Sequence, residues 1–351
     1  MKELKLFAIL LLVVPMFAPA QTQKEKPAVT FEELYDEPFS INKLFIGFQP
    51  LYGELFGTNV NAGFGIEASY YHKDKFDLKA NFRKPYSNEF YDFNRQSFLK
   101  SQSSTVVGSS ISDKPQAFNY YEIGGTYHIK DFDQDSKTKM VLYKKSFKGD
   151  RWASTVPLHA EIPCKVRKIY GARLGAIVWN SSADLSRALS HQRLTNADLK
   201  TSGGQGLTTT YNDAFGQPKQ LEVFGNIHAA NIYVGGSLSW IRNVAVSFDK
   251  YDDGVDDGMM TVFFDIMFAP SLVLDPVTYN NQKYSTDAIK THNIGVRAGI
   301  DGKFNRTLSW AYGGEIGYRP TIVGQGFFAM FKISFPLYST NLDYKVESFG
   351  K

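Results

Sequence analysis

The chain has 351 residues, a formal net charge of +4 and 15% aromatic residues. So mild a net charge argues against nucleic acid or a strongly anionic surface as a partner. The single cysteine, Cys164, excludes an internal disulfide framework. The many Phe and Tyr residues favour β structure with aromatic rings at a membrane interface.

The N-terminus has the pattern of a signal peptide. Lys2 and Lys5 precede the apolar run LFAILLLVVPMF, and APA at 18–20 fits an A-x-A cleavage site. The apolar run is shorter than the ~20 residues of a spanning helix, so we expect a signal peptide at 1–20 rather than a membrane anchor. Residues 21–42 form a polar leader, which could plug a lumen, bind a periplasmic partner or be disordered.

Residues 60–72 show the alternation that dominates the rest of the chain. Apolar residues occupy every second position from Val60 to Tyr70, and polar or small residues lie between them from Asn61 to Ser69. Because side chains alternate across a strand, this stretch predicts a two-faced β-strand. The same reading gives fourteen candidate strands: 43–56, 59–72, 75–85, 117–131, 138–148, 151–166, 168–180, 218–227, 229–240, 242–251, 258–271, 291–303, 307–319 and 325–338. Helical periodicity is confined to 184–194.

The lengths of the connections sharpen this prediction. The long connections are 86–116, 181–217 and 272–290, and they follow odd-numbered strands, so all three leave the sheet at one end. The joints after even-numbered strands are short, as in DFDQDS at 131–136 and around Arg167. Short periplasmic turns, long external loops and an even strand count are typical of outer-membrane barrels. The even count requires a division of 218–240 into two strands, and twelve or sixteen strands are alternatives.

We therefore predict an all-β protein, a transmembrane antiparallel up-and-down β-barrel of about fourteen strands over 43–338, in the cell outer membrane. A periplasmic tail, 339–351, follows it. A closed barrel leaves no strand edge unpaired in hydrocarbon, and the apolar faces would meet lipid. Ionisable residues on the polar faces are expected to line the lumen: Glu67, Asp77, Lys79, Arg83, His159, Glu161, Arg173, Arg297, Glu315 and Lys332. Their mixed signs suit internal pairing better than the single-sign ring of a selective pore.

The APA site followed by Gln21, the strands rich in Tyr, Phe, Asn and Lys, and the aromatic last strand at 326–338 resemble exported barrels of the Bacteroidota. That group includes accessory barrels of secretion and barrel-assembly machines, of the PorP/SprF kind, and small-solute channels. The tail STNLDYKVESFGK departs from the usual barrel, which ends on its last strand.

Two stretches contain residue types that could support catalysis or metal binding. His159 and Glu161 lie on one face of a predicted strand and could share a proton, but no G-x-S-x-G signature accompanies them. DDGVDDG at 252–258 does not match a calcium loop and is interpreted as a solvated turn. We therefore expect no catalytic residue, no metal, no cofactor and no enzymatic activity.

Two functions remain open from the sequence. The first is an accessory or scaffold subunit of an envelope assembly, and the second is a channel for small or hydrophobic solutes. The expected partners are outer-membrane lipid, lipopolysaccharide and envelope proteins, but no nucleic acid. Protein contacts would use 21–42, 252–258, 339–351 or the external loops 86–116, 181–217 and 272–290.

Overall fold

The computed structural model describes residues 29–72, 75–86, 118–142, 158–212, 215–249, 251–305 and 310–340. The predicted signal peptide, the leader before 29, nearly all of the loop 86–116 and the tail beyond 340 lie outside these ranges. Within them, no helix is long and apolar enough to span a membrane.

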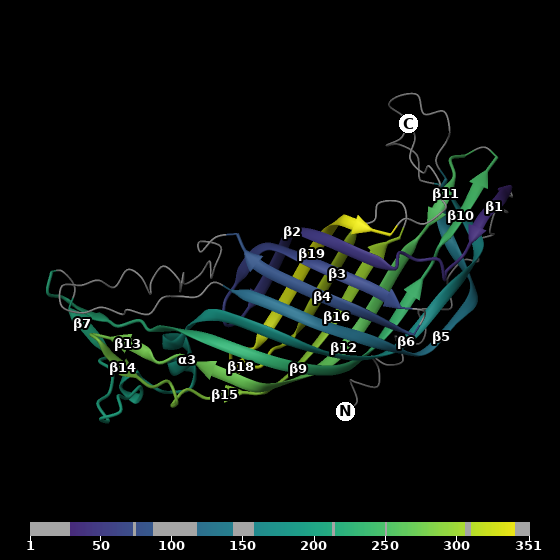
Figure 1. Cartoon of the computed structure of the whole chain (residues 1–351). Coiled ribbons are helices and arrows are strands. Elements are labelled where there is room, and N and C mark those ends of the chain that lie inside the picture. The colour runs from purple at the N-terminus through teal and green to yellow at the C-terminus, as the bar shows by residue number, and fades with distance from the viewer. Residues whose placement is uncertain are drawn as a thin grey trace, which may run out of the picture.

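Ten antiparallel strands form a closed barrel in which each strand pairs with its neighbours in the sequence (Figure 1). The last strand pairs with the first and closes the wall, with Phe331 opposite Gly53. The all-β barrel class predicted from the sequence is thus confirmed. The barrel strands are β2 (Leu44–Phe56), β3 (Asn61–His72), β4 (Phe76–Pro85), β5 (Asn119–Leu142), β6 (Leu158–Asp184), β9 (Phe224–Ile241), β12 (Gly258–Leu274), β16 (Ile294–Phe304), β17 (Ala311–Tyr318) and β19 (Phe327–Ser339).

The predicted count of fourteen strands is wrong. β5 and β6 each contain two predicted strands, 218–240 contributes one barrel strand rather than two, and 242–251 lies outside the barrel as β10 (Val244–Phe248). The supposed turn DFDQDS continues β5, with Asp131 opposite Ile169 and Ser136 opposite Cys164. The run lacks Gly and Pro, so its polarity marks where the strand leaves the barrel wall and not where it ends.

The shared end of the long connections survives this correction. Along the barrel the three predicted long connections follow the third, fifth and seventh strands, β4, β6 and β12, and so leave from one end. The connection 242–257 after β9, at the opposite end, is also long and contains β10. We call this the far end. β2 begins and β19 ends at the opposite end, the near end, where Thr340 N–H donates to the Leu44 carbonyl oxygen at 3.0 Å.

The two faces of the wall differ sharply in polarity. On β3, Ile66 is 43% exposed while its neighbour Glu67 is buried, as the alternation predicts. All ten barrel strands carry exposed apolar side chains on the outer face, among them Leu55, Ile66, Leu78, Ile123, Leu174, Val234, Ile266, Ile294, Ile316 and Phe331. A continuous apolar exterior around a polar interior is the arrangement of a barrel in lipid.

The far-end connections fold into a module over the barrel mouth, at the left of Figure 1. Its elements are α3 (Leu185–His191), η4 (Asn196–Asp198), β7 (Thr210–Asn212) with β8 (Pro218–Gln220), β13 (Val277–Tyr279) with β14 (Gln282–Tyr284), and β15 (Thr291–His292) with β18 (Thr321–Ile322). Asp184 caps α3 by accepting the Arg187 N–H at 2.9 Å. Leu185 and Leu189 of α3 join one apolar cluster with Trp179 and Phe328 of the wall.

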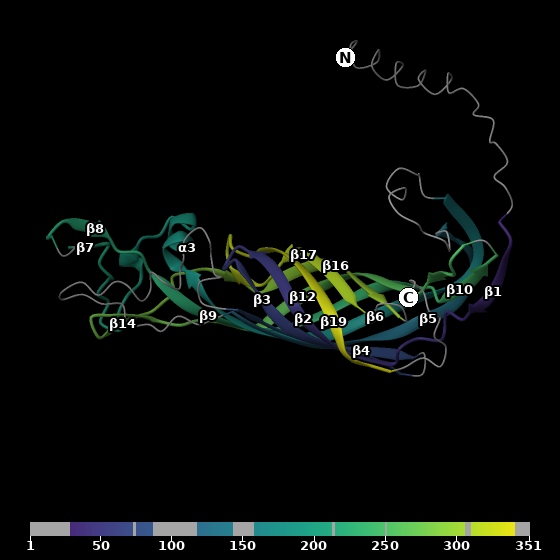
Figure 2. The same ribbon diagram turned by 90° about the horizontal axis from the view of Figure 1, so that it is seen from above.

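A second module stands at the near end, where β5 and β6 continue beyond the wall (Figure 2). Against this extension packs a three-stranded sheet of β1 (Phe31–Asp36), β10 and β11 (Gly254–Asp256). Their common core contains Met140, Ile162, Cys164, Val166, Val244, Val246 and Phe248. The predicted leader therefore supplies a strand, β1, and the predicted turn 252–258 supplies another, β11.

Replacing Ile123 with Arg tests the lipid contact of the outer wall. Ile123 is 68% exposed and sits at mid-height of the wall, opposite Ala80 and Ala176. In water this change would be nearly neutral, whereas in hydrocarbon it should cost about 2–4 kcal/mol of folding free energy. Urea unfolding in lipid vesicles, followed by heat-modified gel migration, measures the difference.

Phe215→Arg is the matched control, because Phe215 is 89% exposed in the far-end module. It should leave the unfolding free energy within about 0.5 kcal/mol of the native protein. Equal, small effects of the two substitutions would show that water, not lipid, surrounds the barrel.

Candidate functional site

The barrel interior holds a set of paired charges that we call the lumenal network. It comprises the cations Lys79, Arg83, Arg173, Arg297, Arg319 and Lys332 and the anions Glu54, Glu67, Glu122, Asp265, Asp301 and Glu315. Cations and anions are equal in number in this set. Every barrel strand except β9 contributes to it directly or, for Arg319, from the residue after β17.

Arg297 stands at the centre of the lumenal network. Its Nη2 donates to Glu122 Oε1 at 2.6 Å, its Nε to Asp265 Oδ2 at 2.9 Å and its Nη1 to Glu315 Oε2 at 3.3 Å. The guanidinium on β16 thus joins carboxylates of β5, β12 and β17. Since β5 does not pair with β16, the Glu122 contact spans the lumen. Charge-assisted bonds of this kind are about twice as strong as neutral ones.

Asp265 links a second guanidinium to this centre. Arg173 donates from Nε to Asp265 Oδ1 at 2.9 Å and from Nη2 to Oδ2 at 3.2 Å, a two-bond contact. Asp265 is fully buried, so its charge depends on these partners. The rings of Tyr233 and Phe263 cover the two guanidinium groups, with Arg297 4.4 Å from the Tyr233 centroid and Arg173 4.1 Å from that of Phe263.

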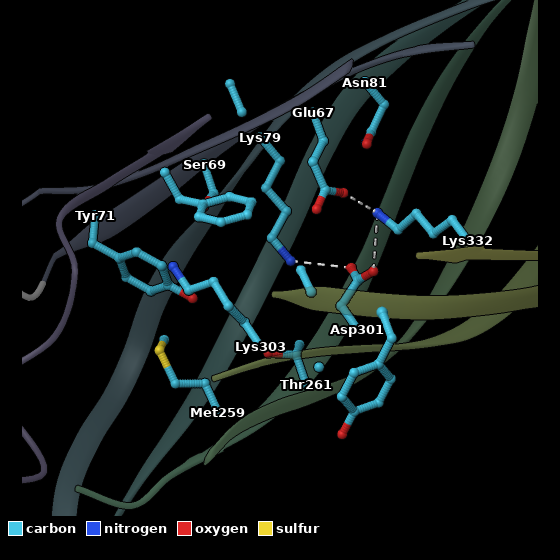
Figure 3. Close-up of a pocket in the computed structure, with 15 residues that line it drawn as sticks. Glu67, Ser69, Tyr71, Lys79, Asn81, Met259, Thr261, Asp301, Lys303 and Lys332 are labelled. Carbon is cyan, nitrogen blue, oxygen red and sulfur yellow. Dashed lines mark hydrogen bonds and ion pairs between the residues drawn. The ribbon is translucent and has the colours of Figure 1, made fainter. Parts of the chain in front are cut away.

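Toward the near end of the barrel, the cations of the lumenal network are lysines rather than arginines. Lys332 Nζ donates to Glu67 Oε2 at 2.6 Å and lies 3.4 Å from Asp301 Oδ1, while Lys79 Nζ donates to Asp301 Oδ2 at 3.1 Å (Figure 3). A cavity of about 60 Å³ lies beside them, and another of about 10 Å³ lies between Lys79 and Arg173. Volumes of this size hold a few water molecules at most.

Toward the far end, the lumenal network meets the apolar cluster under the far-end module. Arg319 Nη2 donates to Glu54 Oε1 at 2.7 Å, and its guanidinium lies 4.7 Å and 4.3 Å from the ring centroids of Phe56 and Phe328. Both rings belong to the cluster that includes Trp179. Apolar packing therefore closes the far mouth.

Residues 37–43, between β1 and β2, form a segment that we call the strap. Asn243 Nδ2 donates to the carbonyl oxygens of Glu37 and Ser40, both at 2.9 Å, and Asn305 Oδ1 accepts the Asn42 N–H at 2.8 Å. Phe39 lies under Arg167, 4.5 Å from its guanidinium. These bonds anchor the strap along the rim formed by β6, β9 and β16.

Ile41 of the strap closes the near mouth. It packs in one cluster with Ile169, Ile241 and Met259 of β6, β9 and β12, and with Tyr71 of β3. β3 stands opposite β9 and β12 around the wall. Because the cluster joins side chains from opposite sides of the barrel, it crosses the lumen, and Ile41 lies within it.

The structure gathers seven of the ten predicted lumenal residues in the lumenal network: Glu67, Lys79, Arg83, Arg173, Arg297, Glu315 and Lys332. An eighth predicted residue, Asp77, is buried at the near end of the barrel. His128 Nε2 lies 3.2 Å from Asp77 Oδ2. The network also includes four residues that the sequence analysis did not predict to face the lumen: Glu54, Asp265, Asp301 and Arg319.

His159 and Glu161 do not line the lumen, and this prediction is corrected. They pair with Val141 and Lys139 in the extension beyond the barrel, and Glu161 is exposed. The error follows from the supposed turn at Arg167. β6 runs straight through that position, so the residues before it belong to the near-end module.

Within the described ranges, no three His, Cys, Asp or Glu side chains are grouped to hold a metal ion. Two carboxylates of 252–258 instead bind inside the near-end module, where Asp253 accepts from Ser247 Oγ at 2.8 Å and Asp256 from Thr138 Oγ1 at 2.5 Å.

The fold and its two opposed surfaces define a transmembrane β-barrel. No protein-family model and no curated protein matches the chain. Solved structures with a similar fold include OprB of Pseudomonas putida at high pH, with 11% identity and a TM-score of 0.20 over 85% of this chain and 94% of that one. OmpT of Vibrio cholerae, an outer membrane protein, is similar in a loop-deletion form (7% identity, TM-score 0.17, 84% and 98% covered) and an in-vitro folded form (8%, 0.17, 87% and 99%).

The expectation that the chain is not an enzyme is corrected here. It is not retained beside the similarity to the two OmpT structures. At these identities and TM-scores the likeness concerns the fold and assigns no reaction.

Arg297→Met should be the most destabilising single change in the lumenal network. It leaves Glu122, Asp265 and Glu315 buried without their shared partner, at a cost of roughly 3–5 kcal/mol. Lys79→Met removes one partner of Asp301 at a site where both side chains are about one-fifth exposed, and should cost about 1 kcal/mol. Urea unfolding of the refolded barrels measures both. Similar costs for the two variants would contradict a network centred on Arg297.

Proposed function

We propose that this protein is an outer-membrane β-barrel that serves as a closed structural subunit of an envelope assembly, of the secretion or barrel-assembly type. One observation carries the proposal: paired charges fill the lumen, and packed side chains close both mouths. A diffusion channel needs a continuous wet path, and a selective pore needs unpaired charges along it. Here the interior charges bind one another.

The apolar exterior supports the membrane location. Each of the ten strands presents large apolar side chains outward, and the closed wall leaves no unpaired strand edge in the hydrocarbon. Barrels with an even number of antiparallel strands are the design of bacterial outer membranes. In such barrels the termini face the periplasm and the long loops face outward. The near end of this protein is then periplasmic and the far-end module external.

The near-end module supports the role in an assembly. It projects beyond the wall on two long strands and has its own apolar core, which includes Ile162, Val246 and Phe248. A barrel that only crosses the membrane does not need this module. We propose that protein partners bind here, at surfaces that include β1 of the predicted leader and β11 of 252–258. Outer-membrane lipid and lipopolysaccharide are the proposed contacts of the wall.

The alternative function, a solute channel, would require large rearrangements of the side chains that fill the lumen. Solute passage would require displacement of Ile41, separation of the Arg297 contacts and opening of the cluster around Trp179. Each step exposes buried charges or apolar side chains, and their costs add because the sites are far apart.

Partner capture tests the proposal with the full chain in mild detergent. The native protein should co-purify with envelope proteins at constant stoichiometry, as measured by mass spectrometry. Val246→Asp places a charge in the core of the near-end module, where Val246 is fully buried, and should reduce recovery of these proteins several-fold. The barrel itself should still show heat-modified migration.

Ser247→Ala is the matched control, because Ser247 lies next to Val246 on the other face of β10 and bonds Asp253 instead. It should retain the partners. Capture of no stoichiometric partner by the native protein, or full capture by Val246→Asp, would overturn the role assigned to the near-end module.

A further inference from the structure

The cavity of about 60 Å³ near the near mouth has an unusual lining. Lys79, Lys303 and Lys332 all border it, together with the carboxylates Glu67 and Asp301 (Figure 3). Three ammonium groups thus face two carboxylates. The lumenal network is balanced elsewhere, so this cavity carries one surplus positive charge.

The surplus belongs to Lys303. Its Nζ is shielded from solvent and has no hydrogen-bond acceptor among the residues that the structure describes. The rings of Phe45 and Tyr71 lie 4.9 Å and 5.9 Å from Nζ and offer cation–π attraction. Rings stabilise the charge in part but leave the N–H donors of the ammonium group unused.

The acids nearby are committed to other cations. Glu67 Oε2 accepts from Lys332 at 2.6 Å and from Gln49 at 3.1 Å, and the two oxygens of Asp301 contact Lys332 and Lys79. Toward the rim, Asp77 contacts His128, and Asp131 is bonded by Arg167 at 2.5 and 2.7 Å. A buried ammonium group without a counter-ion is costly, and no carboxylate among the described residues accepts a hydrogen bond from Lys303 Nζ.

We propose that this cavity binds a small monovalent anion, of halide or formate size, with Lys303 as its principal ligand. The volume admits an ion of this size and excludes larger organic anions. Thr261 and Ser69 also line the cavity and can donate hydroxyl hydrogen bonds to an anion. Met259 and Tyr71 belong both to the lining and to the cluster under Ile41, so the strap roofs the site. The anion site does not depend on the proposed assembly role.

The test compares small anions with gluconate, which is too large for the cavity, at constant pH and ionic strength. The heat-modification midpoint of the full-length protein should rise with chloride, bromide or formate and then saturate, by about 2 °C or more. Lys303→Met should abolish this dependence. In gluconate, Lys303→Met should melt at the same temperature as the native protein or higher, because it removes an uncompensated buried charge.

Lys283→Met is the matched control, since Lys283 is an exposed lysine of the far-end module, and it should keep the native anion response. Bromide-soaked crystals of the native protein provide a readout that does not depend on the variant folding, with an anomalous peak expected within hydrogen-bond distance of Lys303 Nζ. A native midpoint that does not distinguish bromide from gluconate would overturn the site. So would an equal response in Lys303→Met, or a bromide-free cavity.

Discussion

Arg297 holds together the interior of this barrel, because three carboxylates from three other strands converge on one guanidinium. A closed wall with an apolar exterior must bury whatever charge its inner face carries, and buried charges are tolerated only when they are paired and hydrogen-bonded. The equal numbers of acids and bases in the lumenal network meet that requirement. The tight lumen and the position of the inward rings over the guanidinium groups follow from it.

A different kind of interaction fills the lumen at each of three levels. The cluster around Trp179 closes the far mouth, the Arg297 contacts fill the middle and Ile41 of the strap covers the near mouth. The strap comes from the segment before the first barrel strand, so one stretch of chain both supplies β1 to the near-end module and closes the barrel below it.

The alternation of side chains predicted the barrel class and the facing of strands such as β3, because the period of two depends only on local backbone geometry. The strand count could not be predicted in the same way, because it depends on where each strand ends. The polar run DFDQDS was interpreted as a turn, but it remains part of a strand because β5 continues beyond the wall beside β6. Asp265 lies alone in the apolar run TVFFDIMF, and a lone inward carboxylate of this kind was the available signal for the network. The pairing of Asp265 with Arg173 and Arg297 depends on barrel closure, which one sequence does not specify. The strap could not be predicted from the sequence either, because Asn243 and Asn305 hold it through hydrogen bonds to residues far away in the chain.

If the lumen is sealed, the folded protein carries no ion current, and conductance across a planar lipid bilayer measures this. The full-length protein is inserted after its folded state is verified by heat-modified migration, and current is recorded at both polarities. A sealed lumen should leave the bilayer silent, without steady conductance steps. Stable, ohmic steps that scale with the amount of folded protein would contradict it, because they require a continuous water path past Ile41, Arg297 and Trp179.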